Sequence, residues 1–520
     1  MGYFIISFAL SCLLALTLTP AVRQLAVRWH FVDRPDERKH HRVPVALGGG
    51  TAVFLAALTT AMATIGLAWL RGWPNLLTSE RATELWGLAG AALLTTVVGV
   101  LDDTARLRVR YKVAAQFVAA LLVISAGLLI ERVSVLGMTV ELGLLAVPFT
   151  VFWLVGAINS FNLIDGADGV ASSVGVVLCL TIAVMSIAQS NPADGMVMLS
   201  LAGALLGFLC YNFPPATIYL GDAGSMLIGL VLGAMAISSS TKGAATMMLA
   251  VPVAVWAVPI LDTSAAVLRR KLTGRSLFCT DRGHLHHVLL QRGWTQRSTL
   301  AFVAILAGWT CGGALLAFHF KQDWIAILTA GILVSALAAT RIFGHVEMAL
   351  VTGSVRKAVA KGWTRPRPGA PHQVESRVRL QGTHEWEIFW AGLTEAAVRY
   401  DLTSIQLNIH LPAMQEGYFA NWNDPSADNR DMQWQLSTPL VLEGRSVGRL
   451  DVVGMATKSQ SLASFSNFLH FLEHVQDNFQ NMAIRLTKQK DSNYLITADP
   501  YVNEDDAQKP NQNQPVLRSP

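Results

Sequence analysis

The sequence predicts an α-helical polytopic membrane protein with about 11 transmembrane helices and a small C-terminal cytoplasmic α/β domain. Hydrophobic residues make up 52% of the 520 residues and charged residues only 14%, whereas soluble proteins carry roughly 25% charged residues. The charges are also unevenly distributed, because residues 1–342 contain 39 of them and the remaining 178 residues contain 36. The first part therefore has the composition of a membrane domain, and the second that of a soluble region.

Apolar stretches of about 20 residues can cross the hydrocarbon layer of a bilayer as helices. Several of those in this chain are rich in glycine, which allows membrane helices to pack closely. The first stretch has no basic segment before it and no A-x-A cleavage site, so we interpret it as a retained helix and not as a signal peptide. The eleven stretches lie at residues 2–22, 48–70, 85–101, 112–130, 142–160, 171–189, 195–212, 223–241, 244–268, 299–319 and 323–342.

Basic residues in the short loops predict the orientation, because cytoplasmic loops of membrane proteins are enriched in Lys and Arg. One alternating set of loops contains 17 basic residues, in segments 23–42, 106–112 and 269–297, and the other set contains only 5. With eleven spans, this distribution places the N-terminus outside and the C-terminus in the cytoplasm. We expect a multi-pass protein of the inner (plasma) membrane, with residues 1–342 as its membrane-embedded domain.

Three segments are expected beyond residue 342. Residues 343–377 form a basic, proline-containing linker that could lie along anionic headgroups. Residues 378–490 form a small α/β domain, and the tail at 491–520, rich in Asn, Asp, Gln and Pro, is expected to be disordered. Within the domain, helices are predicted near 384–400 and 462–488, and strands at 403–411, 432–442 and 446–454, with a hairpin turn at 443–445. The sequence does not indicate what this domain binds.

Acidic and histidine-rich clusters all fall on the predicted cytoplasmic loops. Because five such loops lie on one side of the membrane, they indicate one composite site at the boundary between membrane and cytoplasm. The five are DRPDERKHHRVPVALGGG at 33–50, GVLDDTARLRVRYK at 99–112, NSFNLIDGADGV at 159–170, IYLGDAGSM at 218–226 and RRKLTGRSLFCTDRGHLHH at 269–287.

Asp102 and Asp103 follow directly on an apolar span. Carboxylates at such a depth are costly to bury and usually functional. One aspartate could hold or deprotonate an acceptor, while the other supports a metal ion or Lys112. The structural alternatives are a solvated acidic helix end and an ion-pair network with the neighbouring Arg and Lys residues.

The stretch from Asn159 to Val170 combines carboxylates and carboxamides with glycines, which permit tight turns. Asp165 and Asp168 are three residues apart, a spacing that puts both carboxylates on one side of a helical turn. Asn162 adds a neutral oxygen one turn earlier. Oxygen ligands suit Mg²⁺, which takes few protein ligands together with substrate phosphates. The alternative is an Asx-rich turn that caps the next helix.

Asp222 lies in the segment GDAGS, where the next apolar helix is expected to begin. An N-cap aspartate is common at such a position, so this signal is weak when it is taken alone. Together with the carboxylates of the 159–170 loop, however, Asp222 is predicted to supply a further ligand of the metal site from a second loop.

The segment DRGHLHH contributes one arginine and three histidines. A zinc site would need a cysteine or a further ligand at suitable spacing, so we favour contacts to phosphate oxygens. A basic loop that touches lipid headgroups is the alternative. No phosphate-binding P-loop or dinucleotide-binding glycine motif is found. The loops together indicate phosphoryl transfer at a membrane surface, where positioning and charge neutralisation supply most of the catalysis. The arginine and the three histidines of the segment DRGHLHH are Arg282, His284, His286 and His287.

With all five loops considered, residues 1–320 resemble the polyprenyl-phosphate N-acetylhexosamine-1-phosphate transferases. That family includes phospho-N-acetylmuramoyl-pentapeptide transferase and the eukaryotic dolichyl-phosphate enzymes. Five ordered motifs carry the resemblance: Arg38-Lys39 with His41 and Pro44 before Gly48-Gly49; Asp102-Asp103; Asn159, Asn162, Asp165 and Asp168; Gly221-Asp222; and His284, His286 and His287.

The resemblance implies a fold of ten or eleven membrane helices and a nucleotide-sugar site on the cytoplasmic face. Mg²⁺, for which Mn²⁺ can substitute, would bridge the donor diphosphate through residues matching Asn162 and Asp222. A polyprenyl phosphate would approach near Asp102 and attack the β-phosphorus, so that UMP leaves. Asp165 and Asp168 would position the nucleotide or support the metal. The remaining substrate-binding residues, most of which would neutralise phosphates, are Lys39, His41, Lys112, Asn159, Arg282, His284, His286 and His287.

The His-x-His-His pattern resembles the bacterial N-acetylglucosamine branch, which implies UDP-N-acetylglucosamine as donor, undecaprenyl phosphate as acceptor and cell-envelope polysaccharide synthesis as the destination. UDP-N-acetylmuramoyl-pentapeptide or another UDP-N-acetylhexosamine is the alternative donor. Arg106 departs from the branch pattern, because several members have an acidic residue there, which leaves roles within 102–106 less defined. Two non-enzyme alternatives are a transporter, which predicts mid-membrane carboxylates, and a sensor or scaffold with an inactive membrane core. We expect no nucleic-acid partner, and leave a homo-oligomer open.

Overall fold

The protein is described by a computed structural model and divides into two compact units, Met1–Arg365 and Pro366–Pro520. Each unit is described by itself. The described residues are 2–33, 44–73, 76–241, 247–248, 250–272, 283–344, 348, 351–352, 374–381, 385–400, 402–411, 416–423, 433–442, 445–455 and 470–485.

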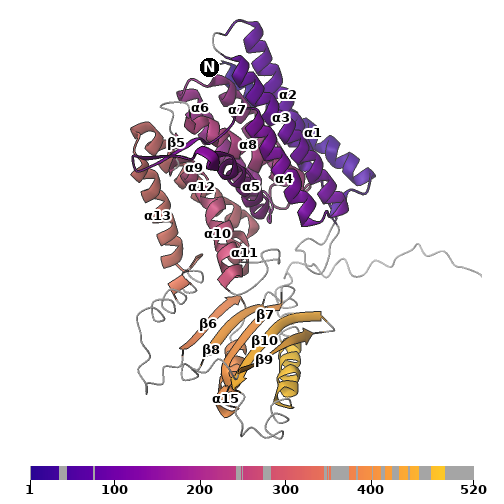
Figure 1. Ribbon diagram of the computed structural model, residues 1–520. Helices are drawn as coiled ribbons and strands as arrows, with labels where there is room; N and C mark the ends of the chain where they lie inside the picture. The colour runs from indigo at the N-terminus through magenta and orange to yellow at the C-terminus, as the bar shows by residue number, and fades with distance from the viewer. Residues whose placement is uncertain are drawn as a thin grey trace, which may run out of the picture. The chain divides into compact units, whose positions relative to one another are not determined.

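The N-terminal unit is a bundle of long helices (Figure 1). Eight helical segments of its described part are long and apolar enough to cross a membrane, which supports a multi-pass membrane protein. The helices are α1 (Gly2–Arg28), α2 (Gly49–Leu70), α3 (Ser79–Ala105), α4 (Val109–Ser125), α5 (Ala146–Ile164), α6 (Val170–Ala188), α7 (Pro192–Asn212), α8 (Gly221–Thr241), α9 (Ala250–Val255), α10 (Ala257–Leu272), α11 (Leu285–Gln291), α12 (Gln296–Phe320) and α13 (Asp323–Ala339).

Each of the eleven predicted apolar stretches overlaps a helix, but the ninth also contains the short strand β5 (Met247–Met248) and is divided into α9 and α10 at Trp256. Pro259 explains the division, because it lacks the N–H group that the carbonyl of Val255 would accept in a continuous helix. The helices α4, α10 and α13 have only 17, 16 and 17 residues. The count of eleven spans therefore stays a prediction.

Small residues bring α8 close to its neighbours. A Cβ atom on Gly99 of α3 would lie 2.3 Å from the Cα of Ala223, and one on Gly50 of α2 would lie 2.1 Å from the backbone nitrogen of Gly224. Such close approach of backbones is typical of membrane helices that pack through glycine. The N-terminal turn of α8 is therefore held between α2 and α3.

A buried ion-pair network joins the other ends of these helices. Arg81, near the start of α3 and only 5% exposed, donates from Nε to Asp194 Oδ1 of α7 (2.6 Å) and from Nη2 to Ser238 Oγ of α8 (2.7 Å). Ser238 Oγ in turn donates to Asp194 Oδ2 (2.7 Å), and Glu84 also pairs with Arg81. The network therefore links α3, α7 and α8 far from the polar loops.

The described part of this unit also contains five short strands. β1 (Val32–Asp33) pairs antiparallel with β2 (Val45–Ala46). β3 (Arg132–Val135) pairs antiparallel with β4 (Met138–Glu141) and parallel with β5 (Met247–Met248). The β1–β2 pair belongs to the first polar loop and brings Asp33 and Val45 to the wall of the cavity described below.

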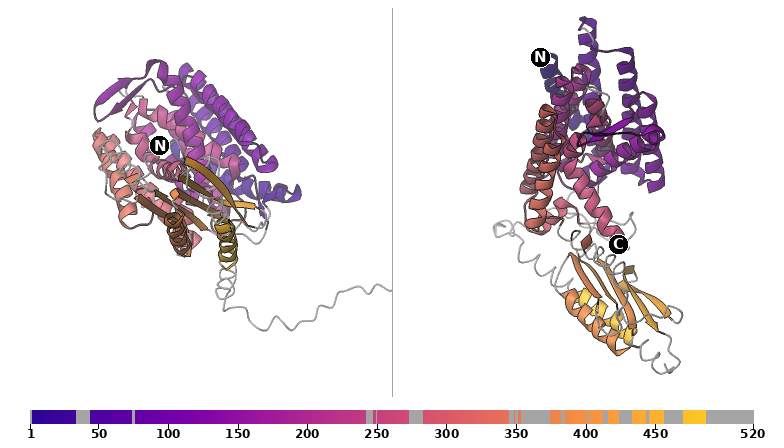
Figure 2. Two further views of the ribbon diagram at one scale, coloured as in Figure 1. Left: turned by 60° about the horizontal axis from the view of Figure 1, so that its bottom comes forward. Right: turned by 60° about the vertical axis from the view of Figure 1, so that its left-hand side comes forward.

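The C-terminal unit contains a five-stranded antiparallel sheet of order β6-β8-β7-β10-β9. Helix α15 and a helix at residues 470–485 cover one face of this sheet (Figure 2), since Trp386, Phe479 and Leu407 share one buried cluster. The bounds are β6 (Val374–Gln381), α15 (Glu385–Arg399), β7 (Leu402–Leu411), β8 (Glu416–Asn423), β9 (Gln433–Leu442) and β10 (Arg445–Met455).

Three strands and two helices of this unit lie close to their predicted ranges, while β6 and β8 were not predicted. β6 begins inside the segment 343–377 that we expected to be a linker. In its sequence VESRVRLQ, apolar residues alternate with polar ones from Val378 onward, which is a short strand pattern that the neighbouring basic residues obscured. Most of the linker, the turn at 443–444 and the tail at 491–520 lie outside the described residues.

Candidate active site

A cavity of about 490 Å³ is lined by residues of all five polar loops. Its wall contains the carboxyl groups of five aspartates and the ring of His287. A separate cavity of about 240 Å³ between α2, α3, α7 and α8 is lined by apolar side chains and one glycine, so it offers no acid, base or metal ligand. The five aspartates of the polar cavity are Asp33, Asp103, Asp165, Asp168 and Asp222.

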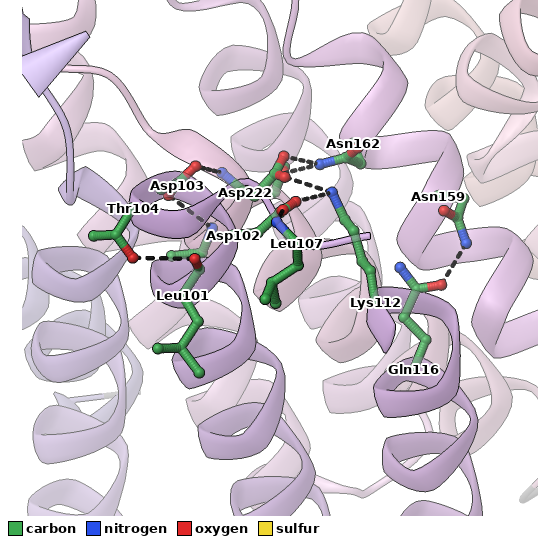
Figure 3. Close-up of polar contacts among 12 residues, drawn as sticks. Leu101, Asp102, Asp103, Thr104, Leu107, Lys112, Gln116, Asn159, Asn162 and Asp222 are labelled. Carbon is green, nitrogen blue, oxygen red and sulfur yellow. Dashed lines mark hydrogen bonds and ion pairs between the residues drawn. The ribbon is translucent and has the colours of Figure 1, made fainter. Parts of the chain in front are cut away.

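Four predicted site residues from four helices form one contact network beside this cavity (Figure 3). The Lys112 ammonium donates to Asp102 Oδ2 at 3.0 Å and also pairs with Asp222. Asn162 Nδ2 lies 2.5 Å from Asp222 Oδ1 and 2.9 Å from the Ser225 hydroxyl oxygen. Residues that are 10 to 110 positions apart in the sequence are therefore in direct contact.

Asp103 caps helix α8 from the neighbouring helix α3. Its Oδ1 accepts the backbone N–H of Asp222 at 3.0 Å, and its Oδ2 accepts that of Ala223 at 3.4 Å. The first N–H groups of a helix have no partner within the helix, so this carboxylate satisfies two of them. Gly221 has a φ of +72°, and a Cβ atom there would lie 2.5 Å from Asp103 Oδ2. Glycine is thus required at 221 by both the backbone conformation and the capping carboxylate.

The loop between α5 and α6 is fixed in a similar way. Asp168 Oδ2 accepts the backbone N–H of Ala216 at 2.9 Å. Asn212 Oδ1, at the end of α7, accepts the N–H of Gly169 at 3.0 Å and the hydroxyl of Ser172 at 3.1 Å. Asn212, which the sequence analysis did not single out, therefore holds the N-cap residue Gly169 and the first turn of α6.

Asp165 is surrounded by other carboxylates. Burial raises the pKa of its carboxyl group well above the ordinary value, and the negative charges of Asp222, Asp103 and Asp168 raise it further. Such crowding of acids is unfavourable unless a cation or a proton compensates it.

Asn159 is held against α4 and lies outside the described wall of the cavity. Its Nδ2 donates to Gln116 Oε1 at 2.7 Å and to the carbonyl oxygen of Val155 at 2.8 Å. Gln116 is buried, and among the described residues its Nε2 has no hydrogen-bond partner. The sequence analysis missed Gln116, although it lies four residues after Lys112 and hence on the same face of α4.

The three histidines lie at the start of α11. The His286 ring packs against Gly166, where a Cβ atom would be 2.4 Å from its Nε2, and the His287 ring lines the cavity. Burial, followed by the proximity of His287, lowers the pKa of His286 to about 3. This corrects the expectation that the whole cluster neutralises phosphate charge, because His286 is uncharged at neutral pH.

Asp262 of α10 is a further residue that the sequence analysis missed. Its Oδ2 lies 2.9 Å from His284 Nδ1, and its Oδ1 accepts the backbone N–H of Leu285 at 2.7 Å. A lone aspartate within an apolar stretch gave the only signal. Arg106 is the C-terminal cap of α3, with a φ of +49°, and its side chain is exposed. The predicted residues Lys39, His41 and Arg282 lie outside the described residues.

The donor set around Asp222 is compatible with a magnesium ion. Within the described ranges, no group of three or more His, Cys, Asp or Glu side chains has a metal-binding arrangement. Mg²⁺ needs fewer protein ligands than that, since it is usually held by one or two carboxylates together with waters and substrate phosphates. The adjacent Asn162 amide and Asp222 carboxylate provide such a pair when the amide oxygen, in place of the nitrogen, faces the ion.

Comparison with known proteins gives a consistent result. The profile of glycosyl transferase family 4 matches residues 85–240. A Bacillus subtilis protein named probable undecaprenyl-phosphate N-acetylglucosaminyl 1-phosphate transferase is 31% identical over 332 residues, which is 64% of this chain and 89% of the relative. The decaprenyl-phosphate N-acetylglucosaminephosphotransferase of Mycobacterium tuberculosis is 33% identical over 62% of this chain and 84% of its own length. An Escherichia coli undecaprenyl-phosphate alpha-N-acetylglucosaminyl 1-phosphate transferase is 26% identical over 67% and 93%, respectively.

Proposed function

The chain belongs to glycosyl transferase family 4, and we propose that it transfers N-acetylglucosamine 1-phosphate from UDP-N-acetylglucosamine to undecaprenyl phosphate. The products are UMP and a polyprenyl-diphospho-N-acetylglucosamine that serves cell-envelope polysaccharide synthesis. The observation that carries this proposal is the contact network of Asp102, Lys112, Asn162 and Asp222 beside a cavity lined with carboxylates. The relatives, which are named as N-acetylglucosamine 1-phosphate transferases, favour the N-acetylglucosamine donor.

The transfer needs one bond to form and one to break. An oxygen of the lipid phosphate attacks the β-phosphorus of the donor, and the bond from that phosphorus to the oxygen bridging it to the α-phosphate breaks, so that UMP departs. Asp102, which contacts Lys112, would receive a proton from the lipid phosphate or orient it. Lys112 offers a positive charge between the acceptor and donor positions.

The donor diphosphate would be held with Mg²⁺ by Asn162 and Asp222. When bound there, Mg²⁺ supplies positive charge to the diphosphate and so stabilises the departing UMP. Asp103 would hold the backbone at Asp222, while Asp165 and Asp168 line the same cavity and would support the ion or the nucleotide. This assignment is supported by the contact between Asn162 and Asp222 and by the raised pKa of Asp165.

We further propose eleven transmembrane spans in the inner (plasma) membrane, with the active site and the C-terminal α/β unit in the cytoplasm. The excess of basic residues in one set of loops supports this orientation. Labelling of single cysteines introduced at Arg106 and at Gly137 in intact cells would test it. We expect a membrane-impermeant reagent to label only the residue at position 137, and labelling at 106 would contradict the orientation.

Membranes that contain the protein should release UMP from UDP-N-acetylglucosamine when undecaprenyl phosphate and Mg²⁺ or Mn²⁺ are present. Membranes with the Asp222→Ala variant at equal abundance are the control, and a chelator should remove the activity of the wild type. UDP-N-acetylgalactosamine and UDP-N-acetylmuramoyl-pentapeptide, tested in parallel, decide the donor. Lack of UMP release with every donor would overturn the proposal, and release with the pentapeptide donor alone would overturn the choice of sugar.

A further inference from the structure

The histidine segment is held in place by a carboxylate that does not itself line the cavity. Asp262 lies within α10, two turns before the basic end of that helix, and is only 3% exposed. Both of its oxygens contact the corner where α11 begins: one meets His284 Nδ1 and the other accepts the Leu285 N–H. Neither Asp262 nor His284 belongs to the described wall of the 490 Å³ cavity.

Helix α11 depends on this external cap. It has only seven residues and no side-chain cap of its own, and a helix this short is unstable in isolation. A negative charge at a helix N-terminus is favourable because the unpaired N–H groups there carry partial positive charge. Asp262 supplies that charge. Its contact with His284 also fixes the ring of this residue, which is the N-cap of α11.

A second contact to α10 fixes the same corner. A Cβ atom on Gly283 would lie only 2.2 Å from Arg269 Nη2, so the backbone before His284 packs directly on that guanidinium group. Asp262 and Arg269 are seven residues apart and hence on one face of α10. One face of α10 therefore holds the segment from Gly283 to Leu285.

The position of this corner sets the positions of the two histidines that follow. His286 packs on Gly166, between Asp165 and Asp168 of the carboxylate loop, and His287 reaches the cavity. The His286 and His287 rings are 4.3 Å apart, and His284 stacks parallel to His286 at 6.0 Å. A shift at His284 would therefore be passed directly to both rings. His286 Nε2 has no hydrogen-bond partner among the described residues, and it faces the backbone of Gly166.

We propose that Asp262 is a positioning residue for the sugar-nucleotide site: it caps α11 and orients His284, and thereby places His286 against the carboxylate loop and His287 at the cavity that takes the donor. This inference rests on the proposed function. Asp262 acts on donor binding through the histidine segment, and it has no contact with the Asp102–Lys112 side of the site, where the lipid phosphate is expected. Its loss should therefore weaken the donor interaction selectively.

The test is the kinetics and donor binding of the purified full-length Asp262→Ala variant. Loss of two hydrogen bonds to a charged group should raise the KM for UDP-N-acetylglucosamine, and the Kd measured with radiolabelled donor, by about tenfold or more. The KM for undecaprenyl phosphate should change less than about threefold. The Asp262→Asn variant keeps an acceptor oxygen for the Leu285 N–H, so it should recover part of the donor affinity.

Asp323→Ala is the matched control. Asp323 is also a buried aspartate that accepts a backbone N–H from another element, that of Leu136, at 2.9 Å. It lies beyond the far end of α12, a helix of 25 residues whose first residue lines the cavity, and hence about 37 Å away. Its replacement should lower thermal stability without changing the donor KM.

A double-mutant cycle with His286→Ala separates positioning from a general loss of structure. If Asp262 acts through the histidine segment, the double variant should be no worse than the worse single variant. The proposal would be overturned if the effects of the two single variants on the donor KM multiplied in the double variant. An unchanged donor KM in Asp262→Ala, or equal increases in the KM values for donor and lipid phosphate, would also overturn it. If Asp262→Ala does not fold, the Asp262→Asn and His284→Ala variants must both raise the donor KM. An inactive wild type would instead overturn the proposed function.

Discussion

Replacement of Gly221 by alanine should disable the site without removing any of its functional groups. The backbone at Gly221 has a φ of +72°, which costs a residue with a Cβ about 1–2 kcal/mol. The added Cβ would also lie 2.5 Å from Asp103 Oδ2, well inside the roughly 3.5 Å of a normal contact, so the carboxylate must move by about 1 Å. That movement weakens the two hydrogen bonds that cap α8, each of which contributes about 1.5–3 kcal/mol because the acceptor is charged.

The expected result for Gly221→Ala is a loss of kcat of about 100-fold or more, because a displacement of 1 Å near reacting groups has effects of that size. The concentration of Mg²⁺ that gives half-maximal activity should also rise, since Asp222 is the residue displaced. UMP release and thermal unfolding in detergent are the measurements. Gly137→Ala is the matched control: Gly137 also has a positive φ, +81°, but a Cβ atom added there would have nothing within 4 Å.

Gly137→Ala should lose a small amount of stability and keep its activity within about twofold, because it meets only the backbone cost. If Gly221→Ala instead retained wild-type kcat and an unchanged requirement for Mg²⁺, the assignment of Asp103 as the cap that positions Asp222 would be refuted.

Three further results are expected. Asp222→Ala and Asp102→Asn should each lower turnover by at least about 100-fold in folded protein; a near-normal rate in UMP release would remove that residue from the mechanism. Asp165→Asn should raise the melting temperature at neutral pH. The raised pKa of the Asp165 carboxyl group means that the folded state binds the proton more tightly than the unfolded state, so the charged form destabilises the fold above this pKa. The advantage of asparagine should vanish below about pH 4, where the carboxyl group is protonated in both states. Equal melting temperatures throughout a pH series without Mg²⁺ would contradict this. Deletion of residues 370–520 should leave transferase activity and instead alter oligomerisation or regulation; complete loss of UMP release in a well-folded truncation would make the C-terminal unit part of catalysis.

Hydropathy alone was sufficient to locate the long helices, because a bilayer imposes one length and one composition on every span. The division of the ninth span at Trp256 could have been anticipated from Pro259, but the apolar composition on both sides concealed it. The strand β8, with the sequence EGYFANWN, was missed because glycine and asparagine are rare in strands. Here Tyr418, Ala420 and Trp422 are buried against the helices, so tertiary packing outweighs local propensity.

The site was predictable in its parts but not in its contacts. Charged residues on one set of loops indicated convergence, and the structure brings Asp102, Lys112, Asn162 and Asp222 into contact. The capping role of Asp103 depends on backbone groups 119 and 120 residues further along the chain, so no local pattern could reveal it. Asp262 and Gln116 were missed for the same reason, since each acts on a residue of another helix.

The Arg81 network has a consequence for how the molecule can move. Arg81 ties α3 to Ser238 of α8, and Asp103 ties the same two helices together 22 residues later, about 33 Å away. Two helices held together at both ends cannot slide or rotate without breaking a hydrogen bond to a charged side chain, so α3 and α8 are expected to move as one rigid unit.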